Sequence, residues 1–153
     1  MGFGKATENW DELGVKILGA SADPAAGAEM AYTIGTGRRW LLTGIRAILV
    51  CAVAAANRLP SIRIQTDGAT YDLVAASTVP QTTGLTCYWH WKTNNVVGAT
   101  LGTMGAAAFM TVGLGIGGIE LPAGAVITSI TTDINAGDNW SVFTFIGKEE
   151  MFI

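Results

Sequence analysis

The chain has 153 residues, of which 50% are hydrophobic and 14% are charged, and its formal net charge is −3. This length allows one domain with a substantial core, and the apolar content excludes an intrinsically disordered chain. The weak negative charge argues against a basic nucleic-acid-binding surface. A surface so poor in charge is expected to be buried in part against other chains.

Residues 1–14 (MGFGKATENWDELG) mix glycine, charge and two isolated aromatic residues, Phe3 and Trp10, without a visible period. A short helical turn over residues 9–13 fits this stretch, but we interpret it as an extended arm. Two roles stay open, a frayed terminus or an arm that lies on a neighbouring subunit through Phe3 and Trp10. The N-terminus has no apolar run of the kind that marks a secretory signal. Residues 15–153 are expected to form a single domain.

The first half of that domain alternates short apolar runs with turn residues. Gly44 lies in the middle of the longest run and indicates a bulge or bend. Asp67-Gly68 predicts a tight turn that closes a hairpin between the last two of these runs. Strands are predicted at residues 15–18, 28–34, 38–53, 57–65 and 71–74.

Residues 85–92 (LTCYWHWK) predict a strand whose odd positions face the core. Trp89 and Trp91 then point inward, and His90 points outward between them. Cys87 belongs to the inward series, and Cys51 continues the apolar series of the long strand before it. Two buried free thiols are the preferred interpretation, and one bridge between core strands is the alternative.

Residues 93–119 carry no charge. Within them, residues 110–117 alternate aliphatic side chains with Thr111 and glycines, which predicts a strand with one nearly bare face. Such a face suggests that a bulky group packs over the backbone, either Trp89 or Trp91 of an opposing sheet or a partner chain. The letters of residues 113–118 satisfy GxGxxG, but a strand-to-helix turn is needed for a dinucleotide site, and we expect no helix there. A membrane-active segment remains a lesser alternative for residues 93–119.

Residues 121–146 (LPAGAVITSITTDINAGDNWSVFTFI) have the clearest pattern of the chain. Pro122 and Gly124 predict a turn, and residues 126–134 alternate with period two as in a half-buried strand. Residues 135–139 supply turn chemistry, and residues 140–146 resume as a strand, so a hairpin with a five-residue loop is expected. Eight or so strands without a convincing amphipathic helix predict an all-β fold, an antiparallel β-sandwich in which we prefer the jelly-roll form.

Residues with catalytic or ligand-binding chemistry are few and isolated. Residues 133–139 resemble the start of a calcium loop, but the twelfth position is Thr144 where a glutamate is needed. His90 is the only histidine, so a zinc site cannot be assembled from neighbouring residues. Glu149 and Glu150 are adjacent and nothing pairs them as acid and base. We therefore expect no catalytic residues, no metal, no cofactor and no enzymatic activity.

Two stretches carry a family resemblance. GTGRRWLLTGIRAIL (residues 35–49) and LPAGAVITSITTDINAGDNWS (residues 121–141) resemble segments of small structural proteins of tailed bacteriophage virions. The resemblance implies a non-enzymatic β-sandwich of the virion, such as a head decoration (cement) protein on the capsid surface, assembled in the host cytoplasm. It implies the major capsid protein and copies of the same chain, as a homodimer or homotrimer, as partners, with no nucleic acid or membrane. The first stretch has Gly-Thr-Gly where Pro-Ala-Gly is frequent, which leaves head or tail location open.

Such a protein is expected to dock through its apolar ends and its exposed aromatics. The candidate interface residues are Phe3, Trp10, Tyr88, His90, Met151, Phe152 and Ile153. The alternative function is a carbohydrate-binding β-sandwich on a tail or fibre, in which Trp40, Trp89 or Trp91 would serve as a stacking platform.

Overall fold

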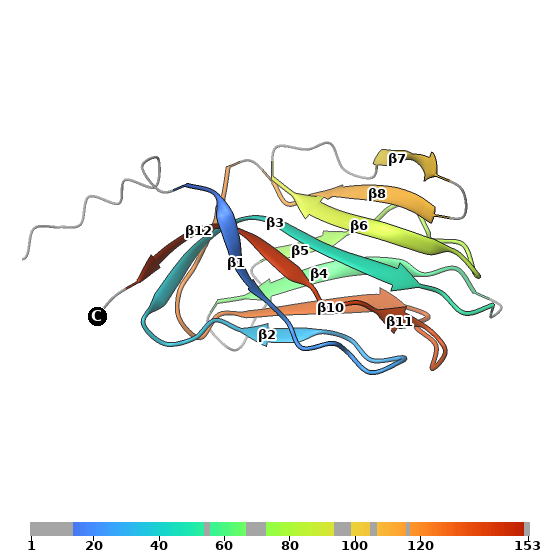
Figure 1. The fold of residues 1–153 in the computed structure, drawn as a ribbon, viewed down its shortest axis with the longest axis horizontal. Coiled ribbons are helices and arrows are strands. Elements are labelled where there is room, and N and C mark those ends of the chain that lie inside the picture. The colour runs from blue at the N-terminus through green and yellow to red at the C-terminus, as the bar shows by residue number, and fades with distance from the viewer. Residues whose placement is uncertain are drawn as a thin grey trace, which may run out of the picture.

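The computed structural model describes residues 14–53, 56–66, 73–93, 99–104, 107–115 and 117–151, with backbone alone at 99–104 and 107–108. These residues form two β-sheets that pack face to face (Figure 1), so the predicted β-sandwich is confirmed. The jelly-roll connectivity stays a prediction. No helix in the described part of the chain is long and apolar enough to cross a membrane.

The larger sheet is built around one long strand, β3. In spatial order it contains β1 (Lys16–Ala20), β12 (Thr144–Met151), β3 (Arg38–Val50), β6 (Thr86–Lys92), β8 (Ala107–Gly113) and β7 (Ala99–Met104), and β9 (Ile119–Leu121) and β11 (Asn139–Trp140) also pair with β3. The smaller sheet contains β2 (Ala31–Thr33), β10 (Val126–Thr132), β4 (Leu59–Gln65) and β5 (Leu73–Ala76). The pairing of β6 with β8 is parallel, which departs from the antiparallel arrangement predicted throughout.

The bulge predicted at Gly44 is confirmed. Along β12 the partner of Ile146 is Gly44 and the partner of Gly147 is Leu42, so one extra residue of β3 is inserted between these pairs. A Cβ on Gly147 would collide with the carbonyl oxygen of Leu41, so only glycine fits opposite the bulge. The bend lets the first half of β3 pair with β9 while its second half pairs with β6.

The predicted hairpin of residues 126–146 is wrong. Strand β10 belongs to the smaller sheet and β12 to the larger one, so residues 133–138 cross between the sheets. The predicted strand 140–146 is also divided into β11 and the start of β12, which continues to Met151. A tertiary contact decides this path, since the Asp138 carboxylate at the crossing is bound to Arg58 and to the backbone of Ala52.

Strand β10 is half-buried as predicted, with Ile127, Ser129 and Thr131 on its buried side. The two buried hydroxyls are satisfied by Glu29, whose carboxylate accepts hydrogen bonds from Ser129 Oγ at 2.6 Å and Thr131 Oγ1 at 3.3 Å. Trp140 Nε1 in turn donates to Thr131 Oγ1 at 3.2 Å. Buried polar groups are tolerated here because each has a partner.

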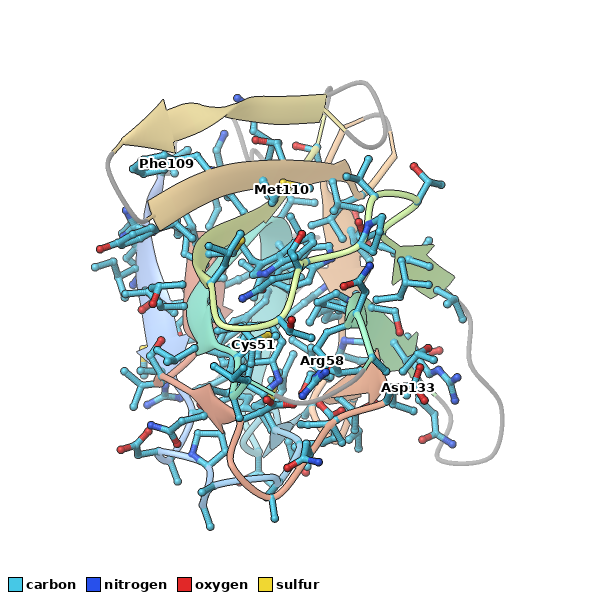
Figure 2. All side chains as sticks on the ribbon, turned by 90° about the vertical axis from the view of Figure 1, so that its right-hand side faces the viewer. Cys51, Arg58, Phe109, Met110 and Asp133 are labelled. Carbon is cyan, nitrogen blue, oxygen red and sulfur yellow. The ribbon has the colours of Figure 1, made fainter. Side chains whose placement is uncertain are left out.

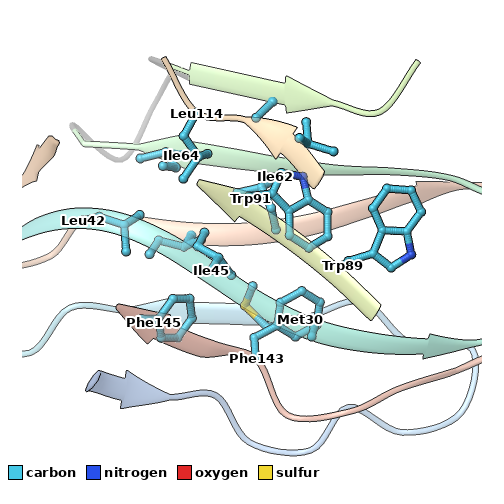
Figure 3. Packing of buried hydrophobic residues seen from close by; sticks show 14 of the residues in the cluster. Met30, Leu42, Ile45, Ile62, Ile64, Trp89, Trp91, Leu114, Phe143 and Phe145 are labelled. Carbon is cyan, nitrogen blue, oxygen red and sulfur yellow. The ribbon is translucent and has the colours of Figure 1, made fainter. Parts of the chain in front are cut away.

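Four tryptophans of the described residues are buried in the core, namely Trp40, Trp89, Trp91 and Trp140, each at most 1% exposed. Figure 3 shows Trp89 and Trp91 among the buried hydrophobic residues. The inward positions predicted for Trp89 and Trp91 are confirmed. These two rings stack on each other at 5.6 Å, and Trp91 also meets Phe143 at 6.3 Å. Stacked rings of this kind add to the free energy gained from burial.

The expectation that Trp89 or Trp91 packs over a glycine row is wrong. Strands β6 and β8 are neighbours in the same sheet, where Trp89 pairs with Met110 and Trp91 with Val112. All four therefore point inward together, and Gly113 is at the end of the strand on the other side. The glycines that follow lie outside β8, and Gly115 and Gly117 have positive φ angles of 101° and 77°.

Candidate binding groove on the outer face of the larger sheet

The outer face of the larger sheet carries a groove of about 530 Å³. We call it the Arg46 groove. It is bounded by residues of β3, β6, β8 and β12 and of the segment that joins β11 to β12. Its lining residues are Arg46, Ala47, Ile48, Tyr88, Trp89, His90, Phe109, Met110, Thr111, Ser141, Val142 and Thr144.

Strand alternation brings the groove residues together. Because Trp89 is buried on β6, its neighbours Tyr88 and His90 face outward. The parallel register of β8 then places Phe109 beside Tyr88 and Thr111 beside His90. Figure 2 labels Phe109 together with its inward neighbour Met110, which is 5% exposed.

One wall of the groove is aromatic. The rings of Tyr88 and Phe109 stack with their centroids 4.9 Å apart and an interplanar angle of 16°. Tyr88 is nevertheless 40% exposed. Part of a large apolar surface therefore meets solvent here, which is typical of a binding surface.

The opposite wall is Val142, in the segment between β11 and β12. Ser141 holds this segment against β3, because Ser141 N donates to the carbonyl of Ile48 at 2.8 Å and Ser141 Oγ accepts from Ile48 N at 2.9 Å. Val142 is 44% exposed. The half-buried Ile48 therefore forms a floor between an aliphatic wall and an aromatic wall.

The groove has one permanent charge, the guanidinium of Arg46. This exposed side chain has no hydrogen-bond or ion-pair partner among the described residues, and no carboxylate belongs to the groove lining. Burial, together with the charges of Lys92 and Arg46, lowers the pKa of His90 below its ordinary value. His90 is therefore neutral at pH 7, and its ring lies over the bare backbone of Gly44, where a Cβ would be 3.2 Å from Nε2.

A buried hydroxyl lines the same groove. Thr111 is 2% exposed, and its Oγ1 has no hydrogen-bond partner among the described residues. A buried hydroxyl without a partner costs free energy that a bound donor or acceptor can recover.

The described lining of the groove holds few ionisable side chains. Neither a carboxylate nor a cysteine accompanies His90 among these residues. The described residues contain no group of three His, Cys, Asp or Glu side chains that could hold a metal ion. What the groove offers is apolar surface, hydroxyls and one available cation.

A second polar cluster, which we call the Arg58 corner, lies inside the sandwich. Arg58 Nε and Nη2 donate to the two carboxylate oxygens of Asp138 at 2.6 and 2.9 Å. The backbone N–H groups of Ala52 and Asn135 donate to the same carboxylate at 2.8 and 2.7 Å. Burial would raise the pKa of Asp138, but these hydrogen bonds outweigh it and hold the pKa below the usual value. With both oxygens occupied, Asp138 acts as a structural anchor.

The two cysteines are free and buried, as preferred from the sequence. Cys51 lies next to the Arg58 corner (Figure 2), and burial, followed by the negative charge of Asp138, raises its pKa to about 11. The Cys51 thiol is therefore protonated and unreactive at neutral pH.

The predicted interface residues fall into three groups. Tyr88 and His90 meet in the groove. Met151 is 66% exposed but ends β12, while Thr144 of the groove begins it, so roughly 23 Å of strand separates them. Phe3, Trp10, Phe152 and Ile153 lie outside the described residues.

Sequence reasoning missed Arg46, Phe109, Thr111 and Val142. Counting outward positions along β3 from Gly44 could have found Arg46. The parallel neighbour β8 and the segment holding Val142 had no local signal, since both depend on pairings that are distant in sequence. The stacking platforms of the carbohydrate hypothesis, Trp40, Trp89 and Trp91, are all buried and cannot meet a ligand.

Comparisons with known proteins do not add a family to this description. No protein-family model matches the chain. No curated protein matches it either.

Proposed function

We propose that the chain is a non-enzymatic structural protein of a tailed-bacteriophage virion, a head decoration (cement) protein that binds across major-capsid-protein junctions. The observation that carries the proposal is the Arg46 groove, an open apolar surface with a cation that has no partner among the described residues. An exposed apolar groove of this composition is suited to docking another protein surface.

The two motif segments support this proposal through their architectural role. The turn at Pro122–Gly124 is hydrogen-bonded to the strand before β3, with Gly124 N donating to the carbonyl of Ile34 at 2.8 Å and Ile34 N to that of Ala125 at 2.9 Å. Trp40 then pairs with Leu121 between β3 and β9. The two segments that resemble virion proteins therefore help to build the sandwich, and they also contribute Arg46 and Ser141 to the groove on its outer face.

Stabilisation of a shell by such a protein follows from linkage. A protein that binds only the assembled lattice lowers the free energy of that lattice. Many copies on one shell multiply a modest contact, so strong binding at each junction is unnecessary.

The test uses heads of the encoding phage produced without this protein. Wild-type chain is expected to cosediment with these heads saturably and to raise the temperature at which they open. Val142→Asp, which places a carboxylate in the groove wall, should weaken binding about tenfold, or ~1.4 kcal/mol. Val74→Asp is the matched control, because Val74 is 52% exposed on the smaller sheet. Absence of binding by the wild-type chain, or equal loss in both variants, contradicts the proposal.

A carbohydrate-binding module of a tail or fibre is the second candidate, and the exposed Tyr88 favours it. Stacking on sugars would then use Tyr88 beside Phe109, with Thr111 and Arg46 as hydrogen-bonding groups. This function would be favoured over the first if the wild-type chain bound a glycan array but not phage heads, and if Tyr88→Ala abolished the glycan binding.

A further inference from the structure

The composition of the Arg46 groove specifies its occupant. Its walls are the Tyr88–Phe109 pair and Val142, and its charged side chain is Arg46, with no carboxylate in the lining. A complementary ligand therefore presents a large apolar side chain next to a carboxylate. Such a ligand places its carboxylate on the Arg46 guanidinium, and its apolar side chain covers the exposed aromatic wall.

Residues 1–13 of the chain have this chemistry. Their side chains carry three carboxylates and one ammonium, from Glu8, Asp11, Glu12 and Lys5. Alternate side chains of an extended backbone share a face, so in an extended bound conformation Trp10 would lie on the same side as Glu8 and Glu12, and Asp11 on the other. Bound in this way, the segment would present an indole with a carboxylate on each side of it.

The spacing of the segment also fits the groove. Alternate residues on an extended chain are roughly 6.6 Å apart, which is the repeat of outward positions along a strand of the sheet. Ile48 and Arg46 are two such positions on β3, and Tyr88 and His90 are their partners on β6. If the Trp10 indole lies over Ile48 and against Tyr88, the carboxylate two residues away in the arm therefore lies level with Arg46.

The direction of β1 indicates that the groove belongs to another copy. Lys16 at the start of β1 pairs with Gly147, whereas Ala20 at its end pairs with Thr144, which lines the groove. The chain therefore enters β1 at the end away from the groove, and an arm that continued in this direction would lead away from the groove of its own molecule. Thirteen extended residues span at most about 45 Å, enough to reach a neighbour.

We propose that residues 1–13 of one copy bind in the Arg46 groove of a second copy, with Trp10 between Tyr88 and Val142 and a carboxylate of Glu8 or Glu12 on Arg46. This contact deepens the proposed function: the occupant of the groove is a second copy of the chain, so that Val142→Asp weakens binding to heads by separating linked copies. It rests on that proposal for its biological setting, although the contact itself is measured on the purified chain. Linked copies then bind a repeating shell with higher avidity than separate ones.

The test is a charge exchange followed by sedimentation velocity of the full chain. Wild type is expected to self-associate, and both Arg46→Glu and the double variant Glu8→Lys/Glu12→Lys should weaken association at least about tenfold by placing like charges in contact. The triple variant, which restores opposite charges, should recover association. Mixing the Arg46→Glu chain with the double variant should also recover it, because each arm then meets a groove of opposite charge.

Two control variants carry charge changes outside the contact. Val74→Glu adds a carboxylate on the smaller sheet, and Asp11→Lys reverses a charge on the other face of the arm. Both should associate like wild type. Since Arg46 is exposed and has no partner among the described residues, Arg46→Glu should fold normally, which circular dichroism checks.

Three results overturn the proposal. These are a monomeric wild type, association that survives Arg46→Glu, and a loss in Arg46→Glu that neither the triple variant nor mixing repairs. If heads bind a wild-type chain that stays monomeric, the arm contact is wrong and the proposed function stands. If the triple variant recovers self-association but the wild-type chain does not bind heads, the arm contact stands and the proposed function is wrong.

Discussion

Arg58 and Arg46 are the same residue type in opposite settings. Arg58 is 1% exposed and donates to both oxygens of Asp138 and to the carbonyl of Ala56. Arg46 is exposed in an apolar groove without a partner among the described residues. The difference shows that this chain pairs the cation it buries in its interior. The Arg46 cation, which is left open on the surface, is available to another molecule.

The Arg58 corner is closed because it joins distant parts of the chain. The carboxylate of Asp138 links the strand β4 region to the end of β3 through Ala52. Gln81 completes the same end of the sandwich, as its Nε2 donates to the carbonyls of Leu49 and Leu85 at 2.9 and 2.8 Å. At the Arg46 groove, hydrogen bonds between Ser141 and Ile48 hold the Val142 wall to β3.

The largest effect on stability is expected from breaking the buried Arg58–Asp138 ion pair. Arg58→Ala leaves the buried Asp138 carboxylate without its counter-charge, so the free energy of unfolding should fall by about 3–5 kcal/mol. Urea denaturation measures this, with Asp23→Ala, an exposed carboxylate, as the control that should change little. A loss below about 1 kcal/mol for Arg58→Ala would show that the corner is not an anchor.

A smaller loss is expected from Gln81→Ala. The Gln81 Oε1 accepts from Trp89 Nε1 at 2.8 Å, so truncation leaves a buried indole N–H and two carbonyls without a side-chain partner. We expect the free energy of unfolding to fall by about 1–3 kcal/mol. Gln65→Ala makes the same change at a half-exposed residue of β4 and should be close to neutral. Equal effects of the two substitutions would contradict the role given to Gln81.

Acid should lower the stability of the fold by protonating carboxylates that are hydrogen-bonded in the folded state, such as Glu149. Burial would raise the pKa of Glu149, but hydrogen bonds from Lys16 and Trp40 and the charges of Lys16 and Arg38 outweigh it, so the pKa is lowered. A lowered folded-state pKa means that the stabilisation is present above the unfolded-state pKa and is lost as pH falls through the folded-state pKa. Glu149→Gln should therefore lose less of its unfolding free energy than wild type between pH 7 and pH 3. Parallel curves for the two proteins would contradict this assignment.

The smallest effect is expected from Arg46→Ala. Because Arg46 has no partner among the described residues, its removal should change the free energy of unfolding by less than about 0.5 kcal/mol. The comparison with Arg58→Ala uses the same substitution and the same assay. A destabilisation above about 1 kcal/mol would mean that Arg46 stabilises the fold, and would contradict the claim that its side chain is available to a ligand.

Local alternation was enough to predict which residues of β6 face outward. It placed Trp89 and Trp91 inside and Tyr88 and His90 outside. A glycine in the middle of a strand correctly marked the bulge at Gly44. Period two is a property of each strand alone, so it can be read without knowing the strand's neighbours.

Pairings between distant segments could not be predicted in the same way. The turn residues before Trp140 fit a hairpin equally well, and the buried contact of Asp138 with Arg58 is what directs the chain to the other sheet. Phe109 joins Tyr88 through a parallel pairing with no local signature. Tyr88 and His90 of the groove were therefore visible in the sequence, whereas the other residues of its walls were brought to them by tertiary structure.

The most direct test of this account measures two properties of Arg46→Glu, its free energy of unfolding and its self-association constant. We predict an unfolding free energy within about 0.5 kcal/mol of wild type, together with self-association weakened at least about tenfold. Unchanged self-association, or a loss of stability as large as that of Arg58→Ala, would contradict it.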